Sequence, residues 1–427
     1  MNSKYVIIGG CAAGTGAVEA IREVDPTGTI TVISEELYPQ YSRPMISELV
    51  SGKSDMEKMK IRDATFWQKH SVQALTDRTA TSINTQEKTV QLDNGEKVGY
   101  SKLLLATGGK PFVPKMEGAD KDGVFTFTTV SSAQQLITKI NYSHAKKVVV
   151  IGGGLIGVSV SEALVKRGLD VTLVEYKNNI LSLILDGISS KLVEAAIRKA
   201  GLNIATGLTV QKIVGTTKDS GVVGGVILTD GEPMQCDVVI IAIGVTPRTE
   251  LAVGAGIKVN RGIVVDNYMQ TNVSDIYASG DVAEVYDFVT KENRQLPLWP
   301  LAHEQGKIAG YNMAGKKTAY TGGTSMSALK YYGIPIISIG LANPQDPAAY
   351  EILVKYDPEK RIYKKLVLKD NVIVGMTFVY AIERAGIIFY LMKNRINVEK
   401  FKNELLSDTF GLAILPSDLR ENLEELK

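Results

Sequence analysis

Cysteine and histidine are both scarce in this chain, which has two cysteines and three histidines among 427 residues. Cys11 and Cys236 cannot form a disulfide framework, nor can they ligate an iron–sulfur cluster by themselves. The three histidines, His70, His144 and His303, are far apart in the sequence. Because protein metal sites need several ligands in one place, we expect no metal site in this chain.

An excess of charge of one sign is missing as well. The chain has 48 Lys and Arg against 46 Asp and Glu, a formal net charge of +2. This balance gives no overall field that would attract nucleic acid or a membrane surface, so neither is an expected partner. Residues 148–160 are too few and too rich in glycine to span a bilayer. Gly9 and Gly10 interrupt the apolar N-terminal stretch, which favours a buried strand over a signal peptide. We expect a soluble, cytoplasmic protein.

Glycine, in contrast, is abundant, and its 40 residues cluster after apolar runs. The length of the chain favours two or three domains. One pattern occurs twice: a β-branched run, a glycine turn, an apolar helical stretch, and a second run that ends in an acid. It reads KYVIIGGCAAGTGAVEAIREVDPTGTITVISEE at 4–36 and KKVVVIGGGLIGVSVSEALVKRGLDVTLVEY at 146–176. Each copy predicts a strand–helix–strand unit that binds a nucleotide.

The second copy has all three glycines of the dinucleotide-binding pattern. In such a turn the first glycine permits the bend, the second admits a pyrophosphate, and the third lets helix and strand pack. The acid 21 residues after the middle glycine can accept from both ribose hydroxyls and would repel a 2′-phosphate, so NAD is favoured over NADP. The predicted NADH-binding residues here are Gly152, Gly154, Leu155, Ile156, Gly157 and Glu175.

The first copy departs from the pattern because a cysteine replaces the middle glycine. Its acid is again in place at the end of the second strand, where it could hold a second ribose. The predicted cofactor-binding residues are Gly9, Gly10, Cys11, Ala12, Ala13, Gly14 and Glu35. Two such units in one chain suggest two dinucleotides and a hydride relay between them.

Three further stretches carry a resemblance to a known family. They are LLLATGGKP at 103–111, VVIIAIGVTPRTEL at 238–251 and TNVSDIYASGDVAE at 271–284. With the two glycine turns, they resemble the two-dinucleotide-binding flavoproteins, the pyridine nucleotide–disulfide oxidoreductase superfamily. The resemblance implies an α/β fold with two Rossmann-like domains that bind FAD and NADH. It adds Ala106, Thr107, Gly108, Gly244 and Asp281 to the expected cofactor contacts.

Two other stretches narrow the resemblance to one branch. YPQYSRPMISELVSG at 38–52 and LWPLAHEQGKIAGYNMAG at 298–315 are similar to flavin-side segments of NADH:rubredoxin oxidoreductases, ferredoxin-reductase-type flavoproteins and apoptosis-inducing factor. They imply FAD contacts from Arg43, Pro44, Glu304 and Gln305, although Arg43 could instead be a surface arginine. Arg248 could contact NAD or cap a loop.

The end of the chain completes the expected domain organisation. SALKYYGIPIISIG at 327–340 and AGIIFYLMKNRINVEKFKNELL at 385–406 resemble the small C-terminal domain of rubredoxin reductases and of nitrite reductase flavoproteins. The resemblance implies an FAD domain at 1–115 and 246–320, interrupted by an NAD domain at 116–245. A small α+β domain at 321–427 would follow and serve as an interface for partners or for dimerisation.

Departures from the family are informative too. The Cys-x-x-x-x-Cys pair of disulfide reductases is missing, and so is the cysteine that thiol- and peroxide-reducing relatives carry near Pro44. Within the resemblance, Cys11 would lie at the FAD pyrophosphate, far from the flavin ring, so a structural role is favoured over a reactive thiol. Glu48 stands where relatives often have a lysine near flavin N5, and Ser159 replaces the glutamate that partners it.

Two residues are candidates for the proton transfer near flavin N5 that the missing lysine and glutamate would otherwise support. Glu162, one helical turn after Ser159, is a candidate for a relocated carboxylate. His303 could donate a proton near the flavin, or it could be a polar residue satisfied at a helix start. With Glu48 and Ser159, these are the predicted catalytic residues.

The function expected from these features is an FAD-dependent NADH oxidoreductase that passes electrons to a redox protein such as rubredoxin. One alternative is the NAD(H)-handling subunit of an iron–sulfur complex of the 2-oxoacid oxidoreductase or nitrite reductase type, whose partner subunits would supply the clusters. Another is an NADH oxidase. A homodimer is a further open expectation.

Overall fold

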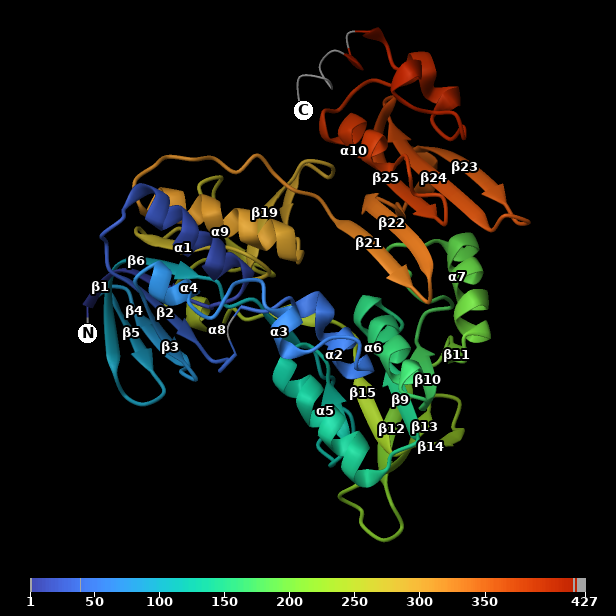
Figure 1. Cartoon of the computed structure of the whole chain (residues 1–427), viewed down its shortest axis with the longest axis horizontal. Coiled ribbons are helices and arrows are strands. Elements are labelled where there is room, and N and C mark those ends of the chain that lie inside the picture. Colours follow the sequence, from blue (N-terminus) through green and yellow to red (C-terminus); the bar gives the residue numbers. More distant parts are fainter. Residues whose placement is uncertain (1, 39, 418, 421–427) are drawn as a thin grey trace. The chain divides into compact units, whose positions relative to one another are not determined.

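The computed structural model describes residues 2–38, 40–417 and 419–420, and divides the chain into two compact units (Figure 1). The first consists of the described part of 1–112 with 127–138 and 244–323. The second consists of 113–126, 139–243 and the described part of 324–427. Each unit is therefore built from segments that are distant in the sequence.

The first unit is organised around a seven-stranded sheet in the order β3-β2-β1-β6-β5-β4, with β18 beside β6. Strands β3, β2, β1, β6 and β18 are parallel, whereas β5 and β4 are antiparallel additions. The sheet strands are β1 (Asn2–Ile8), β2 (Ile30–Ser34), β3 (Val72–Thr76), β4 (Ala80–Asn84), β5 (Thr89–Leu92), β6 (Lys97–Leu105) and β18 (Ile276–Ala278). Smaller sheets are formed by β7 (Gly109–Pro111) with β16 (Val245–Pro247), and by β17 (Ile263–Val264), β19 (Ala283–Asp287) and β20 (Glu292–Arg294).

Helices of the first unit are α1 (Ala12–Val24), α2 (Ile46–Ser51), α3 (Met56–Met59), α4 (Phe66–Lys69), α8 (Glu250–Gly254) and α9 (Trp299–Met313), and α5 (Val130–Ser143) begins in it. Helices α1 and α9 pack closely. A Cβ on Gly306 would lie 2.0 Å from the carbonyl oxygen of Ala13, and one on Gly310 would lie 2.5 Å from that of Ala17. The glycines of the QGKIAG stretch thus allow the two helices to touch at their backbones.

The second unit contains a parallel sheet in the order β11-β10-β9-β15-β8. Its strands are β8 (Val124–Thr126), β9 (Lys147–Ile151), β10 (Asp170–Glu175), β11 (Asn203–Thr206) and β15 (Val238–Ile241). Strand β15 is buried along its whole length, as expected for an apolar strand inside a parallel sheet. Helices α6 (Leu155–Lys166) and α7 (Gly187–Lys199) accompany the sheet, and β12 (Val210–Gly215), β13 (Val223–Leu228) and β14 (Pro233–Gln235) form an antiparallel meander.

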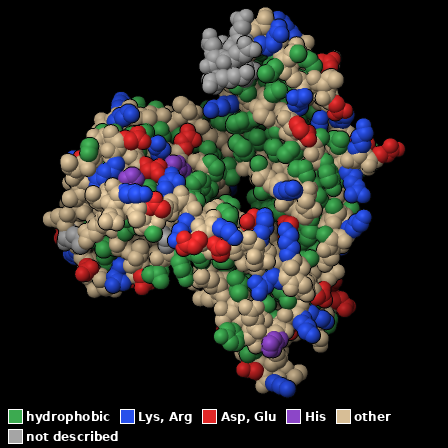
Figure 2. Space-filling view, viewed as in Figure 1, with side chains coloured by type: hydrophobic (Ala, Val, Ile, Leu, Met, Phe, Trp, Pro, Cys, Tyr) green, Lys and Arg blue, Asp and Glu red, His purple; other side chains and the backbone are tan. Residues whose placement is uncertain are grey.

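An antiparallel sheet in the order β21-β22-β25-β24-β23 also belongs to the second unit. It comprises β21 (Met326–Tyr331), β22 (Ile334–Gly340), β23 (Glu351–Asp357), β24 (Ile362–Lys369) and β25 (Val372–Val379), followed by α10 (Ala385–Lys393). We refer to it as the C-terminal sheet. Figure 2 shows hydrophobic side chains gathered on the visible face of this region.

The expected α/β fold, with two parallel sheets and an α+β C-terminal region, is confirmed. The three domain ranges expected from the sequence stay a prediction. Within the described residues, no helix is both long and apolar enough to cross a membrane. In the same residues, no three His, Cys, Asp or Glu side chains are grouped so that they could hold a metal ion.

Candidate functional site

The first glycine turn joins β1 to α1, and backbone contacts leave little space for side chains there. Gly9 has a φ of +116°, and a Cβ on it would lie 2.1 Å from the carbonyl oxygen of Ala106. A Cβ on Gly14 would lie 1.9 Å from the carbonyl oxygen of Gly9. A Cβ on Gly10 would make only an ordinary contact, at 3.5 Å from Ser34. The protein backbone itself therefore requires Gly9 and Gly14.

Cys11 is the N-cap residue of α1 and is partly exposed. It packs against a cluster of small side chains, Ala12, Ala13 and Ala302, which Ala106 and Trp299 also pack against. The free N–H groups at the start of α1 thus open beside a lining of small side chains. Such a helix start suits a phosphate group.

The acid that ends β2 is paired with an arginine that is 213 positions away in the sequence. Glu35 forms an ion pair with Nη1 of Arg248. Thr107 Oγ1 donates to the carbonyl oxygen of Arg248 at 2.8 Å, and the Arg248 N–H donates to that of Gly108 at 3.0 Å. Gly244, with a φ of +136°, precedes the strand that leads to this arginine. The structure therefore places Arg248 among residues that the sequence assigns to FAD.

A second acid, which the sequence did not single out, organises the flavin-side segment. Arg43 and Pro44 lie in a short 3₁₀ turn, where the guanidinium pairs with Glu36 and donates to the carbonyl oxygen of Thr128 at 2.8 Å. Tyr41 Oη donates to Glu36 at 2.5 Å. Arg43 is thus tied to two other segments of the first unit.

The electrostatics connect this segment to the first turn. Burial lowers the pKa of Arg43, but Cys11, Tyr41 and Glu36 outweigh it and raise that pKa above its ordinary range. Burial also raises the pKa of Asp281, while the Arg43 charge acts in the opposite direction. The structure therefore brings together three predicted cofactor contacts: Cys11, Arg43 and Asp281.

Helix α9 completes the surroundings of the first turn. Gln305 is buried, and its Oε1 accepts from the N–H of Gly280 at 2.9 Å, next to Asp281. Its neighbour Glu304 is exposed. His303 Nε2 lies 3.1 Å from Glu19 Oε2 of α1, so this ring nitrogen is engaged by a carboxylate on the helix that α9 packs against.

The residues around the first turn fit FAD. Within the described part of the chain, the buried polar atoms without a hydrogen-bond partner include Ser279 Oγ, Trp299 Nε1 and Arg248 Nε of this region. Buried polar atoms are normally paired, so these three point to a polar ligand. The phosphates, ribose hydroxyls and ring oxygens of FAD would supply acceptors for all three.

The second glycine turn joins β9 to α6 and repeats the geometry of the first. Gly152 has a φ of +109°, and its Cβ would lie 2.5 Å from the carbonyl oxygen of Ala242. A Cβ on Gly157 would lie 1.8 Å from the carbonyl oxygen of Gly152. A Cβ on Gly154 would point into open space. The middle glycine therefore leaves room for a ligand without being needed by the protein's own packing.

Glu175 ends β10 beside this turn. Its Oε2 accepts from the N–H of Gly153 at 2.5 Å, and its Oε1 accepts from that of Lys177 at 2.7 Å. Leu155 and Ile156 begin α6 and are at least partly exposed. Acid, turn and helix start are thus in the arrangement that binds the ribose and pyrophosphate of a dinucleotide. The residues of the second turn fit NAD(H).

The residues predicted to be catalytic lie in different units. Glu48 is in α2 of the first unit, where its carboxylate pairs with Lys53 at 3.1 Å. Ser159 and Glu162 are in α6 of the second unit. Glu162 is buried, and its Oε1 accepts from the N–H of Tyr332 at 3.1 Å, so this carboxylate has a partner on the C-terminal sheet.

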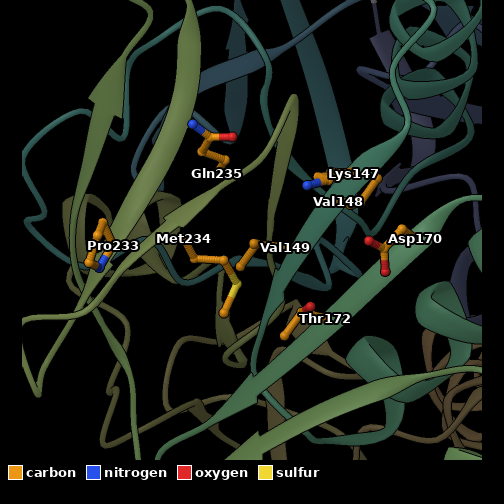
Figure 3. A pocket seen from close by; sticks show the side chains of 8 residues that line it. All are labelled: Lys147, Val148, Val149, Asp170, Thr172, Pro233, Met234 and Gln235. Carbon is orange, nitrogen blue, oxygen red and sulfur yellow. The ribbon is translucent and has the colours of Figure 1, made fainter.

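A pocket of about 340 Å³ in the second unit lies away from the glycine turn (Figure 3). Lys147 and Asp170, the first residues of β9 and β10, line it together with Met234 of the meander. The turn and its acid follow the opposite, carboxyl ends of these two strands. Dinucleotides bind at carboxyl ends, so this pocket is separate from the predicted NADH site.

Comparisons with known proteins agree with this geometry. Residues 3–306 match the family model described as pyridine nucleotide-disulphide oxidoreductase. Residues 326–396 match the one described as rubredoxin NAD+ reductase C-terminal domain.

Relatives differ in how much of their own length the chain spans. The NADH oxidase of Methanocaldococcus jannaschii is 32% identical, over 94% of this chain and 93% of the relative. The NADH-dependent phenylglyoxylate dehydrogenase subunit epsilon of Aromatoleum evansii is 29% identical, over 96% of each. The nitrite reductase [NAD(P)H] of Bacillus subtilis is 32% identical, over 87% of this chain but 45% of the relative. The chain thus spans about half the length of that enzyme.

Solved structures show the same fold. The NAD-dependent persulfide reductase from A. fulgidus superposes with a TM-score of 0.88 and 28% identity, covering 100% of this chain and 83% of that one. The NADH:rubredoxin oxidoreductase from Clostridium acetobutylicum superposes with a TM-score of 0.77 and 25% identity, covering 93% and 97%. The chain therefore belongs to the pyridine nucleotide-disulphide oxidoreductase family, whose members bind FAD and NAD(H).

Proposed function

We propose that this chain is an FAD-dependent NADH oxidoreductase that passes electrons to an external redox protein of the rubredoxin type. The observation that carries the proposal is the pair of glycine turns, one surrounded by unpaired buried polar atoms and one by the carboxylate Glu175. Bound FAD would supply the centre that takes a hydride from NADH and returns electrons to an acceptor.

The residues of the chain would bind and orient the two dinucleotides. The starts of α1 and α6 would hold the two pyrophosphates, and Glu35 and Glu175 the two adenosine riboses. Arg43 and Asp281 would lie along FAD, because each interacts electrostatically with the other beside the first turn. Glu48, Ser159, Glu162 and His303 stay candidates for proton handling and for nicotinamide placement.

The two cysteines support an external acceptor. Cys11 is partly exposed at the start of α1, Cys236 is buried just before β15, and both are free thiols. A thiol pair that could store two electrons is therefore not available from these residues. Unpaired thiols also fit a reducing compartment, which supports a cytoplasmic location.

Anaerobic stopped-flow mixing with NADH tests the proposal. The flavin absorbance near its visible maximum should bleach within one turnover, and reoxidation should be fastest with rubredoxin in a panel that includes ferredoxin and oxygen. A flavin that stays oxidised in excess NADH would overturn the proposal. Fastest reoxidation by oxygen would instead identify an NADH oxidase, as in the Methanocaldococcus relative.

A second candidate is the NAD(H)-handling subunit of a larger iron–sulfur complex. It is favoured by the match over 96% of a phenylglyoxylate dehydrogenase subunit and by the match to about half of a nitrite reductase. Purification of the tagged chain from its native cells distinguishes the two. Iron-bearing subunits in stoichiometric amounts would favour the complex, whereas an isolated chain that turns over with rubredoxin would favour the first candidate.

We also propose that the chain forms a homodimer through its C-terminal sheet. Ile352, Val354 and Tyr356 are exposed at alternate positions of β23, an edge strand of that sheet. Alternate positions share one face of the sheet, and an exposed apolar stripe of this kind is typical of a protein interface. Light scattering of the FAD-loaded protein should give twice the chain mass, and a monomer at micromolar concentration would overturn this point.

A further inference from the structure

The segment that follows Glu175 is bonded back to the second glycine turn. Residues 176–186 connect β10 to α7, and the N–H of Leu181 donates to the carbonyl oxygen of Gly153 at 2.7 Å. The N–H of Gly153 donates to Glu175 at 2.5 Å. Turn, acid and connecting segment therefore form one hydrogen-bonded assembly, so a shift of the segment would move the groups expected to bind NADH.

The far end of this segment is held by the C-terminal sheet and the loop after β22. Asn343 Nδ2 donates to the carbonyl oxygen of Leu185 at 2.8 Å and to that of Ser182 at 3.2 Å. Thr377, which is fully buried in β25, donates through Oγ1 to the carbonyl oxygen of Ile184 at 3.3 Å. Backbone carbonyls that would otherwise be unpaired thus receive three hydrogen bonds from residues outside the nucleotide-binding segment.

A buried lysine fixes the orientation of the Asn343 amide. Lys365 is 5% exposed, and its Nζ donates to Asn343 Oδ1 at 2.8 Å and to Asp186 Oδ2 at 2.7 Å. An ammonium group has only donors, so the amide oxygen must face the lysine and the NH₂ must face the carbonyls. Asp186 is also the N-cap of α7 and accepts from Tyr363. The contact with Lys365 therefore determines which way the Asn343 amide is oriented.

The start of α6 is held by the same sheet. Tyr331, at the end of β21, is 7% exposed and donates through Oη to the carbonyl oxygen of Leu155 at 2.9 Å. The N–H of Tyr332 donates to Glu162, which is about two helical turns further along α6. In Figure 1, α6 lies beside β21, and the two elements are in contact. The helix start expected to face the NADH pyrophosphate is thus fixed from outside its own βαβ unit.

We propose that the C-terminal sheet is part of the NADH-binding apparatus, with Asn343 and Tyr331 as positioning residues for the second glycine turn. The inference rests on the proposed function and adds that residues outside the dinucleotide-binding fold determine affinity for NADH. Neither role requires contact with the expected ligand. Each acts through backbone carbonyls, by holding the turn and the connecting segment in the geometry that binds, so that less ordering is needed when NADH arrives.

The test compares Asn343→Asp and Tyr331→Phe with Tyr350→Phe as a matched control. Asn343→Asp keeps an acceptor for Lys365 but removes the two N–H donors, and Tyr331→Phe removes one hydroxyl. Tyr350 precedes β23, and its ring lies under Lys369, so its variant removes a hydroxyl elsewhere in the same sheet region. For each FAD-loaded protein, the Kd of NAD+ is measured by calorimetry, and kcat and KM for NADH by steady-state kinetics.

We expect the Kd of NAD+ and the KM for NADH to rise about three- to tenfold in both variants, the range for one or two lost hydrogen bonds. The kcat at saturating NADH, the FAD content and dithionite reduction should match the wild type, and Tyr350→Phe should change nothing. Unchanged Kd and KM in both variants would overturn the positioning role, even if Tm fell. A wild-type chain that binds no NAD+ would overturn the proposed function as well, so the two failures are distinguishable.

Discussion

The two glycine turns have matching contacts at their first and third glycines and differ at the middle glycine position. In each, the first glycine lies against a neighbouring strand end, at Ala106 in one turn and Ala242 in the other. In each, the third glycine would place a Cβ within 2 Å of the first glycine's carbonyl oxygen, at 1.9 Å for Gly14 and 1.8 Å for Gly157. The middle position is Cys11 in one and Gly154 in the other.

This difference shows that a glycine in such a turn can be required for two distinct reasons. The outer glycines are required by the packing of the protein itself, with or without a ligand. The middle glycine in the second turn faces open space, so only a ligand can require it. The cysteine in the first turn therefore shows that a small side chain is compatible with the fold there.

The largest expected effect comes from the third glycines. Gly14→Ala and Gly157→Ala place a methyl group within 2 Å of a backbone oxygen. Helix propensity alone would favour alanine by about 1 kcal/mol, but the overlap with backbone should cost about 3 kcal/mol or more. We expect Gly14→Ala to lose FAD and Gly157→Ala to keep FAD while losing NADH affinity by more than about a hundredfold. Flavin content and NAD+ calorimetry measure the two, and normal binding in either variant would contradict the packing argument.

The next largest effects are expected for the acids that follow the two turns, and substitution of the two acids should differ in its effect. Glu175 bonds the turn itself, whereas Glu35 is paired with Arg248. Glu175→Ala should raise the KM for NADH about tenfold and narrow the preference for NADH over NADPH, because the charge that repels a 2′-phosphate is gone. Glu35→Ala should weaken FAD retention by less, about threefold, since Arg248 remains to contact the ligand. Equal NADH kinetics in wild type and Glu175→Ala would refute this assignment.

The hydrogen bonds around Asp186, which help to hold the segment after the second turn, should weaken at low pH. Burial raises the pKa of Asp186, but hydrogen bonds from Lys365, Tyr363 and Ser189 outweigh it and lower that pKa from 3.8 to about 2. A lowered pKa means that the stabilisation is complete above pH 4 and is lost as the pH falls towards 2. The contribution is on the order of 1–2 kcal/mol.

Asp186→Asn isolates this contribution. The variant should be less stable at pH 7 by about that amount and should lose less stability than the wild type between pH 4 and 2. Urea unfolding at both pH values, followed by far-UV circular dichroism, measures it. Parallel loss of stability in both proteins would show that other carboxyl groups dominate.

The smallest effects belong to the middle position. Cys11→Ala should keep FAD and NADH-driven flavin reduction within about twofold, because the cysteine fills a small space among alanines and Arg43 keeps its interactions with Tyr41 and Glu36. Gly154→Ala should leave Tm unchanged, since its Cβ meets nothing in the protein. Retained FAD with lost NADH-driven reduction in Cys11→Ala would show instead that the thiol takes part in the chemistry.

The fold and both turns could be predicted because their signals are local: apolar strands, glycine spacing and a terminal acid within about 30 residues. The pairs around them could not. The doublet Glu35 and Glu36 gives no sign of which acid meets Arg43 and which meets Arg248. His303 and Glu19 are 284 positions apart, and Glu162 and Tyr332 are 170 apart. Such contacts depend on how distant segments pack, and one sequence does not encode them as a visible pattern.

The contact between α1 and α9 has a consequence for biosynthesis. The first turn precedes the second in the chain, but Glu19 and His303, on the two helices that enclose the first turn, are separated by 284 positions. At about 5–20 residues per second, the ribosome needs roughly 15–60 s to deliver the second helix. During that interval the ribosome synthesises the segments of the second unit up to Ile243. These segments contain every strand of the parallel sheet of that unit. The parallel sheet that carries the second turn is thus expected to form before α9 can pack against the first turn, and the contacts that Tyr331 and Asn343 make to the segments around the second turn follow later still.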